Sequence, residues 1–203
     1  MTLEMQKDEV ELRQLKPVIA TAESLAGYGY LIAEPNGLLR DKIDFYPEVR
    51  VSQPAKFEGN DDICLNLVSF TMRALEVRWM EYHTKHTQTF IPLAGKPFYM
   101  VLGKPTARRA DGGWMNEREA LPDADTVQAF YFDGSGGLVM DRGTWHEVPF
   151  PAAEETHFVC ICTNETNENL EAQGDDGECD GGDLTKRNIV KRMGYTFAIS
   201  ASS

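Results

Sequence analysis

"RWMEYHTKHTQTFIPLAGKPF", residues 78–98, places several polar side chains directly before an apolar run. Glu81 and His83 stand two residues apart, so in a β-strand both point to the same face. The TKHT that follows is typical of a turn, and a second strand then carries Gln88 and Phe90 on one face. Because Phe90 belongs in a core, we expect Gln88 to point inward. An inward glutamine without partners costs about 1–3 kcal/mol, and Glu81 and His83 across the turn are its expected partners.

The rest of the chain is dominated by short runs rich in Val, Ile, Phe, Tyr and Thr, separated by Gly, Pro, Asp and Asn. Such runs are typical of β-strands joined by turns. The clearest are ICLNLVSFTM (63–72), TQTFIPL (87–93), PFYMVLG (97–103), VQAFYFDG (127–134), GLVMDRGTWH (137–146) and THFVCICT (156–163). They predict a mainly β chain, an antiparallel sandwich or barrel with a few short helices.

The C-terminal part of the chain has a different composition. Residues 165–183 contain eight acidic residues and no basic one, among glycines and asparagines, which predicts a solvated acidic loop. For residues 184–203 we expect a helix that Asp183 caps and Gly194 ends, followed by a last strand.

The length and net charge of the chain limit the classes of protein to which it can belong. The 203 residues suit one domain, residues 1–203, with a buried core. Residues 1–13 are charged and predict a loose or helical leader rather than a signal peptide, and a short helix is expected to begin near Thr21. The formal net charge of -12 argues against nucleic acid or an anionic membrane as partner.

Hydrophobicity and cysteine usage bear on the compartment. No run of 18 apolar residues could span a membrane. The four cysteines lack a C-x-x-C spacing and are expected to be free thiols, so the expected location is the cytoplasm.

The polar residues stand at a spacing known from cupins. Cupins carry a first motif His-x-His, four residues, Glu, six residues, Gly, and a second motif that ends in Gly-x-x-His. This chain keeps the spacing with two changed ligand types: Glu81-x-His83, four residues, Gln88, six residues, Gly95, and later Gly143-x-x-His146. The resemblance implies a cupin-like antiparallel β-barrel, also called a double-stranded β-helix or jelly roll.

The changed ligands resemble those of the ureidoglycolate lyase family, formerly called ureidoglycolate hydrolase. That family has a Glu-x-His-x-x-x-x-Gln-x-Phe-Ile-Pro strand pair, which residues 81–92 match. It also has a Tyr-His-Arg-x-x-Trp-His-His-Pro stretch, which Arg142, Trp145 and His146 match in part. Where that stretch has Tyr, His before Arg, and the second His after Trp, this chain has Met140, Asp141 and Glu147. The resemblance covers about residues 14–164 and indicates a divergent member.

The family cleaves ureidoglycolate into glyoxylate and urea, so the resemblance implies a carbon–nitrogen lyase of purine and allantoin breakdown. A base takes the hydroxyl proton, the carbonyl forms, and an acid protonates the departing urea nitrogen. The expected catalytic residues are Glu81, His83, Gln88 and His146. The substrate carboxylate needs a cation, for which Arg142, with its planar fork, is preferred to Lys96. Trp145 is a candidate wall of the substrate pocket.

A divalent metal is the alternative use of the same side chains. Glu81, His83 and His146 form a carboxylate and imidazole set, with Gln88 as a weak fourth ligand. Such a set suits Ni, Mn, Fe or Zn without choosing among them. A metal would polarise the substrate oxygen, and both metal-dependent and metal-free catalysis stay open.

Two other functions stay open beside the lyase: a non-catalytic cupin-like protein that binds a small ligand, and a metal-dependent cupin of another reaction class. The acid/base residues favour the lyase over the first, and the two changed ligands weaken the second. The expected partners are a small hydroxy acid substrate and a second copy of the chain, since exposed edge strands often pair into homodimers. His86 falls in the predicted turn without an assigned role, and His157 is interpreted as structural.

Overall fold

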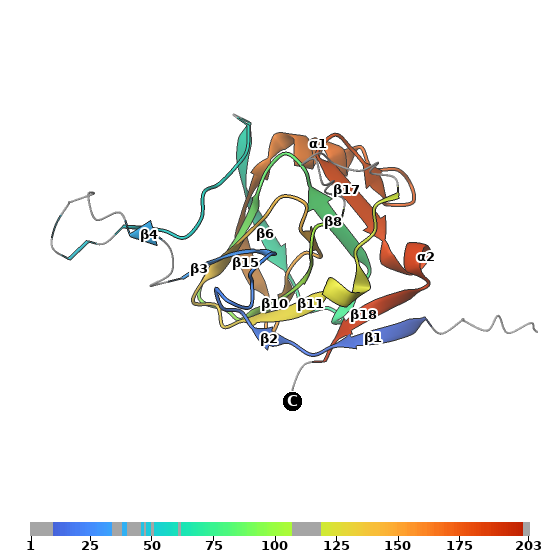
Figure 1. Cartoon of the computed structure of the whole chain (residues 1–203), viewed down its shortest axis with the longest axis horizontal. Helices are drawn as coiled ribbons and strands as arrows, with labels where there is room; N and C mark the ends of the chain where they lie inside the picture. Colours follow the sequence, from blue (N-terminus) through green and yellow to red (C-terminus); the bar gives the residue numbers. More distant parts are fainter. Residues whose placement is uncertain are drawn as a thin grey trace, which may run out of the picture.

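A computed structural model of the chain describes residues 10–33, 38–39, 46, 48–49, 51–60, 62–106 and 119–200. The regular structure is mainly β-strands arranged in layers, with two short α-helices at the periphery (Figure 1). Among the described residues, no helix has the length and apolar character needed to cross a membrane.

The first layer is an antiparallel sheet, here called the outer sheet. It has five strands in the order β3-β12-β9-β15-β6. Their bounds are Gly29–Ile32 (β3), Gly137–Met140 (β12), Gln88–Pro92 (β9), Thr156–Thr163 (β15) and Ile63–Phe70 (β6). Strands β15 and β6 pair along their whole length, and β6 forms the edge of the sheet.

The second layer, here called the central sheet, has eight strands, with β14 paired to β10 beside the main order β16-β17-β8-β13-β10-β11-β2. Their bounds are Cys179–Asp180 (β16), Leu184–Asn188 (β17), Trp79–His83 (β8), Trp145–His146 (β13), Phe98–Gly103 (β10), Phe150–Pro151 (β14), Gln128–Phe132 (β11) and Val18–Ile19 (β2). All of its pairs are antiparallel except β11 with β2. Strand β8 therefore lies between β17 and β13.

The remaining elements surround these two sheets. A small sheet joins β1 (Glu11–Leu15), β18 (Tyr195–Ile199) and β7 (Glu76–Val77), with β1 parallel to β18. Strands β4 (Leu38–Leu39) and β5 (Ser52–Gln53) pair with each other, and Figure 1 shows β4 on an excursion away from the body of the fold. The helices are η2 (Ala124–Thr126), α1 (Asn164–Glu171) and α2 (Ile189–Met193).

Side-chain alternation along the central sheet divides the core into two clusters. Met100 and Leu102 of β10 point toward the outer sheet, where they pack in one cluster with Phe90 and Phe158. Val101, between them, points to the opposite face and belongs to a second cluster that includes residues of β18 and α2. Strand parity therefore decides which side chains of β8 and β13 reach the space between the two sheets.

The predicted fold class is confirmed. All six quoted runs contain the expected strands, and the two sheets form a β-sandwich consistent with a cupin-like fold. Within the described residues, however, the sheets do not close into one hydrogen-bonded barrel. The four cysteines are free thiols, as predicted, and Cys160 and Cys162 both pack in the core between the sheets.

The prediction of a solvated acidic loop over residues 165–183 was wrong at both ends of that segment, while residues 172–176 are exposed and lie outside helices and strands. Its first part is helix α1, and the bend after β16 carries Asp183, which is fully buried. Thr166 on α1 is also buried. One side of helix α1 packs against β17 and β15, and the segment carries two of its carboxylates, Glu178 and Asp183, in buried positions.

The predicted helix over residues 184–193 was half wrong. Residues 184–188 form strand β17 beside β8, and only Ile189–Met193 is helical. Asn188, not Asp183, caps that helix by accepting a hydrogen bond from the Lys191 backbone N–H at 3.0 Å. Gly194 ends it in the left-handed conformation at φ 75°, as expected, and the last strand follows.

The N-terminal expectations also change. Residues 1–9 of the predicted leader lie outside the described residues, and Glu11 to Arg13 belong to β1. In place of a helix near Thr21, residues 22–28 form successive turns. Thr21 and Ser24 exchange backbone-to-side-chain hydrogen bonds of 2.9 and 3.0 Å at their start.

Candidate active site

Two strands of the central sheet bring Glu81 and His146 together. Glu81 on β8 stands opposite His146 on β13 in the antiparallel register, and His146 stands opposite Leu102 of the core between the sheets. Both side chains therefore point into that space, and Oε1 of Glu81 lies 3.6 Å from Nε2 of His146. The side chains are 11% and 1% exposed, so the pair is shielded from water.

The backbone around His146 fixes which ring nitrogen faces the site. Nδ1 lies 2.9 Å from the carbonyl oxygen of Thr144. A carbonyl only accepts, so Nδ1 carries a proton and donates it. Nε2 then either offers a lone pair to the site or, when protonated, forms an ion pair with Glu81.

His83 belongs to a second contact group at the same end of β8. Its Nδ1 lies 3.2 Å from Oδ2 of Asp183, with hydrogen-bond geometry. Nδ1 of His86 lies 2.9 Å from the same oxygen, as an ion-pair contact without that geometry. The ring centroids of His83 and His86 are 4.5 Å apart, and those of His83 and His146 are 5.4 Å apart.

Several polar atoms of these side chains are buried without a hydrogen-bond partner among the described residues. They are Nε2 of His83, both ring nitrogens of His86, Nε2 of His146 and Oε1 of Gln88. Buried polar atoms are almost always paired, so a group of unpaired ones indicates a place for a ligand, an ion or water. Ligand atoms of Glu81, His83 and His146 lie within 4.8 Å of one another, as do those of His83, His86 and Asp183. These buried groups could bind a metal.

Burial and mutual contacts shift the pKa values of the site. Burial works to raise the pKa of Glu81, but the contacts with His146 and His83 outweigh it and lower that pKa below its usual range. Burial lowers the pKa of His83, which favours the neutral imidazole, while the Asp183 hydrogen bond opposes the shift. Burial also works to raise the pKa of Asp183, but His83 and His86 together hold it well below its usual range.

A cavity of about 350 Å³ opens beside the Glu81–His146 pair. Its walls combine charged and apolar side chains: Trp79, Glu81, His146, Glu147, Val148, Leu170 and Lys186. Lys186 supplies the cation, because it stands opposite Glu81 in the register of β17 with β8. Its Nζ lies 5.0 Å from the centroid of the Trp79 ring, a cation–π contact that holds the ammonium group at the wall.

Glu147, which stands where the resembling family has histidine, lines the same cavity with a different set of contacts. Its carboxylate accepts hydrogen bonds from the backbone N–H groups of Arg78 and Trp79 at 3.3 and 3.1 Å. Burial raises its pKa, while the nearby Arg73 guanidinium opposes the shift. Glu147 is thus bound to the backbone of the strand, whereas Glu81 faces a histidine.

The structure confirms the predicted inward direction of Gln88. Gln88 and Phe90 on β9 are both buried, and Phe90 is part of the core between the sheets. Four predicted residues, Glu81, His83, Gln88 and His146, therefore all face the space between the two sheets.

The three predicted substrate-binding residues, Arg142, Lys96 and Trp145, do not line the cavity beside Glu81 and His146. Arg142 is 38% exposed and pairs with Glu58 at 3.1 Å. Lys96 lies beyond the far end of β9 from Gln88, where its Nζ donates to the carbonyl oxygen of Glu155 at 2.8 Å. Trp145 is fully buried on the opposite face of the central sheet from His146, because consecutive strand residues point to opposite faces.

Sequence reasoning missed three residues of the site: His86, Asp183 and Lys186. His86 was placed in a turn and given no role, but it is fully buried. Asp183 and Lys186 lay in segments predicted to be loop and helix. Residues 184–188, LTKRN, have no apolar and polar alternation, so no local signal could have placed Lys186 beside β8.

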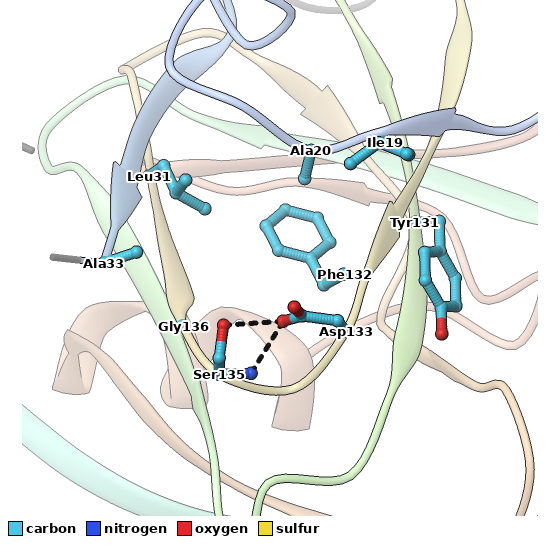
Figure 2. A pocket seen from close by; sticks show the side chains of 9 residues that line it. All are labelled: Ile19, Ala20, Leu31, Ala33, Tyr131, Phe132, Asp133, Ser135 and Gly136. Atoms are coloured by element: carbon cyan, nitrogen blue, oxygen red, sulfur yellow. Dashed lines mark hydrogen bonds between the residues drawn. The ribbon is translucent and has the colours of Figure 1, made fainter.

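A second hollow, of about 210 Å³, lies at the ends of β2, β3 and β11 (Figure 2). Its walls are mostly apolar, and Asp133 there is bound to Ser135, whose hydroxyl and backbone N–H donate to it at 2.6 and 2.8 Å. This hydrogen bonding closes the turn between β11 and β12. The hollow contains no histidine, so the chemistry of the site belongs to the cavity beside Glu81 and His146.

A buried cluster of imidazoles and carboxylates inside a β-sandwich defines a cupin-like protein whose pocket is equipped for acid/base or metal chemistry. Residues 12–178 match the model of the family described as ureidoglycolate lyase, which confirms the resemblance. The chain belongs to the ureidoglycolate lyase family, and this favours a lyase over a binding protein without chemistry.

Individual relatives are distant. A ureidoglycolate lyase of Pseudomonas paraeruginosa is 26% identical over 168 residues, which cover 79% of this chain and 89% of the relative. A ureidoglycolate lyase of Burkholderia mallei is 26% identical over 158 residues, covering 75% of this chain and 84% of the relative. The chain is thus similar to them at the level expected of a divergent family member. Asp183 and Lys186 lie beyond the residues that match the family.

Proposed function

We propose that this chain is a carbon–nitrogen lyase that cleaves ureidoglycolate, or a closely related 2-hydroxy acid adduct, into glyoxylate and urea. The observation that carries the proposal is the buried Glu81–His146 pair at the wall of a cavity, in a chain of this family. The products connect the activity to purine and allantoin breakdown.

The Glu81–His146 pair supports the two proton transfers of the reaction. The ionised Glu81 carboxylate takes the proton of the substrate hydroxyl, and the O–H electrons form the carbonyl of glyoxylate. The C–N bond breaks, and its electron pair stays on the urea nitrogen. His146, whose Nε2 lies 3.6 Å from Oε1 of Glu81, donates the proton that this nitrogen needs.

Lys186 and Gln88 are the proposed binding groups. The ammonium of Lys186 lines the cavity on the same face as Glu81, so it can hold the substrate carboxylate. Arg142, paired with Glu58, is no longer the preferred anchor. Gln88 is buried with an unpaired Oε1, which can accept a hydrogen bond from a urea N–H.

A divalent metal is compatible with the same site. Glu81, His83 and His146 would hold it, because their ligand atoms lie within 4.8 Å of one another and the Nε2 atoms of both histidines are unpaired among the described residues. When bound, the metal would act as a Lewis acid on a substrate oxygen. The donor set suits Ni, Mn, Fe or Zn.

We further propose that the chain forms a homodimer through the outer face of β6. Ile63, Leu65 and Leu67 on this edge strand are 50%, 68% and 68% exposed. Residues 63–70 contain no charged side chain, although charges are the usual protection of an exposed edge. A second copy of the chain would cover this apolar face by a two-fold contact.

The free cysteines support a reducing compartment, and we propose the cytoplasm. Sγ of Cys64 and Sγ of Cys162 lie 3.5 Å apart on neighbouring strands and are not bonded as a disulfide.

Turnover of ureidoglycolate by the purified chain tests the proposed function. Glyoxylate and urea should appear in equal amounts, either in the protein as purified or after addition of Ni²⁺, Mn²⁺, Fe²⁺ or Zn²⁺. Calorimetric binding of ureidoglycolate without any product would indicate the non-catalytic alternative. Neither binding nor turnover under any of these conditions would refute the proposal.

A further inference from the structure

The C-terminal segment beyond the family match contributes a fully buried carboxylate to the site. Asp183 stands in the bend between β16 and β17, and its contacts reach the end of β8 and the residues that follow it. We propose that Asp183 is a positioning residue that fixes the ring orientation and the tautomer of His83. The role of His83 in catalysis rests on the proposed function, but its tautomer does not.

Four contacts hold Asp183 itself in place. Its Oδ1 accepts the backbone N–H of Lys85 at 2.7 Å, and its Oδ2 accepts the hydroxyl of Thr166 at 3.1 Å. Its backbone oxygen accepts the N–H of Thr84 at 3.1 Å, and the side-chain oxygen of Asn169 accepts its backbone N–H at 3.3 Å. The carboxylate therefore has one orientation, with Oδ2 turned toward the histidines.

This orientation decides where the proton of His83 lies. An ionised carboxylate only accepts hydrogen bonds, so the contact of 3.2 Å requires a proton on Nδ1. In the neutral ring Nε2 then carries the lone pair. Nε2 is buried and has no partner among the described residues, so the lone pair is directed at a space that a ligand can fill.

The same oxygen also contacts His86, whose Nε2 is likewise buried and without a partner among the described residues. Oδ2 thus contacts two imidazoles, and each keeps an Nε2 without a partner among the described residues. The arrangement is that of an outer carboxylate that orients a histidine for a proton or a metal on its other nitrogen.

Substitution by asparagine separates orientation from charge. In Asp183→Asn the amide keeps the size of the carboxyl group, and its oxygen can still accept from Lys85. Its NH₂ group would then face Nδ1 of His83 and donate to it, which moves the ring proton to Nε2. His83 would lose the lone pair that faces the site. The matched control is Asp176→Asn, which removes a carboxylate of the same segment that pairs with the exposed Lys191 at 3.0 Å.

Long-range ¹H–¹⁵N spectra of the histidine-labelled protein as purified read the tautomer directly. We expect wild type and Asp176→Asn to show His83 with its proton on Nδ1, and Asp183→Asn to show it on Nε2. Activity on ureidoglycolate, kcat/KM, should fall by about 10- to 100-fold in Asp183→Asn alone.

The outcomes separate this inference from the proposed function. A wild-type spectrum with the His83 proton on Nε2 would overturn the inference, and it needs no variant if Asp183→Asn does not fold. An unchanged His83 signal in folded Asp183→Asn would overturn it too. If wild type shows no turnover but the tautomers behave as expected, the proposed function fails and the positioning role of Asp183 stands.

Discussion

Replacement of Glu81 by glutamine should abolish most of the activity while leaving the fold in place. The change keeps the size of the side chain and removes its negative charge. The variant loses the base that takes the hydroxyl proton and the negative charge that faces Nε2 of His146 at 3.6 Å.

The size of the effect follows from the loss of a general base at the cavity wall. The Glu81 side chain is 11% exposed and lines the cavity, and glutamine in its place cannot take a proton. General acid–base catalysis by one group contributes about 100- to 10,000-fold. We expect kcat to fall by about 100- to 10,000-fold in Glu81→Gln.

The chain contains a matched control for this experiment. Glu155 and His157 form a pair of nearly the same length, 3.5 Å, but their side chains are 52% and 45% exposed. Glu155→Gln removes the carboxylate that pairs with His157 on the surface. This variant should keep kcat within about twofold of wild type.

Glyoxylate release, measured continuously by reduction with NADH and lactate dehydrogenase, is the assay for both variants. Circular dichroism and thermal unfolding establish that each variant is folded. A folded Glu81→Gln that keeps more than a third of the wild-type kcat would refute the role of Glu81. Equal losses in Glu81→Gln and Glu155→Gln would show that the assay reports stability and not chemistry.

Three further predictions follow from the site and the surface. Lys186→Met should raise KM for ureidoglycolate by at least about tenfold with a smaller change in kcat. Lys191→Met, on the exposed helix, should change neither constant. Equal KM values for both variants would exclude Lys186 as the carboxylate anchor. Burial lowers the pKa of His83, so below about pH 6.5 the unfolded chain binds more protons at His83 than the folded chain does. The free energy of unfolding should therefore fall as the pH drops through that value. Urea unfolding of His83→Gln should show a shallower fall, and identical pH profiles for wild type and variant would contradict the shift. The double variant Leu65→Glu with Leu67→Glu should raise the dimer dissociation constant by roughly 1,000-fold or more. Covering each leucine stabilises the dimer by about 1–2 kcal/mol, and a two-fold interface contains each leucine twice. Sedimentation that shows only monomer in wild type would rule the dimer out.

The parts of the fold that depend on local pattern were predictable from the sequence. Alternation placed Glu81 and His83 on one face, and the parity of Gln88 with Phe90 gave its inward direction correctly. The turn that precedes His146 was also predictable from the glycine in it. Gly143 adopts a φ of 83° in this turn before β13, a conformation that favours glycine.

The parts that depend on long-range pairing could not be read in the same way. Nothing local distinguishes a helix from a strand in LTKRN, and only the pairing with β8 makes it a strand. Composition described residues 165–183 correctly as acidic, but an average over the segment conceals the single carboxylate, Asp183, that is buried.

Face assignment on an edge strand raises a similar difficulty. The alternation of β6 was correctly interpreted as a strand, with Ile63, Leu65 and Leu67 on one face. That face is the exposed one, while Val68 and Phe70 on the other face pack against the core. Both faces are apolar, so the pattern alone gives the strand but not its inner side.

A crystal structure of the protein soaked with glyoxylate tests most directly whether these side chains form one reacting site. We predict glyoxylate in the cavity between Glu81 and Lys186, with an oxygen within hydrogen-bond distance of Nε2 of His146. Glyoxylate bound only in the hollow at the ends of β2, β3 and β11, with the cavity beside His146 filled by side chains, would contradict the proposed site.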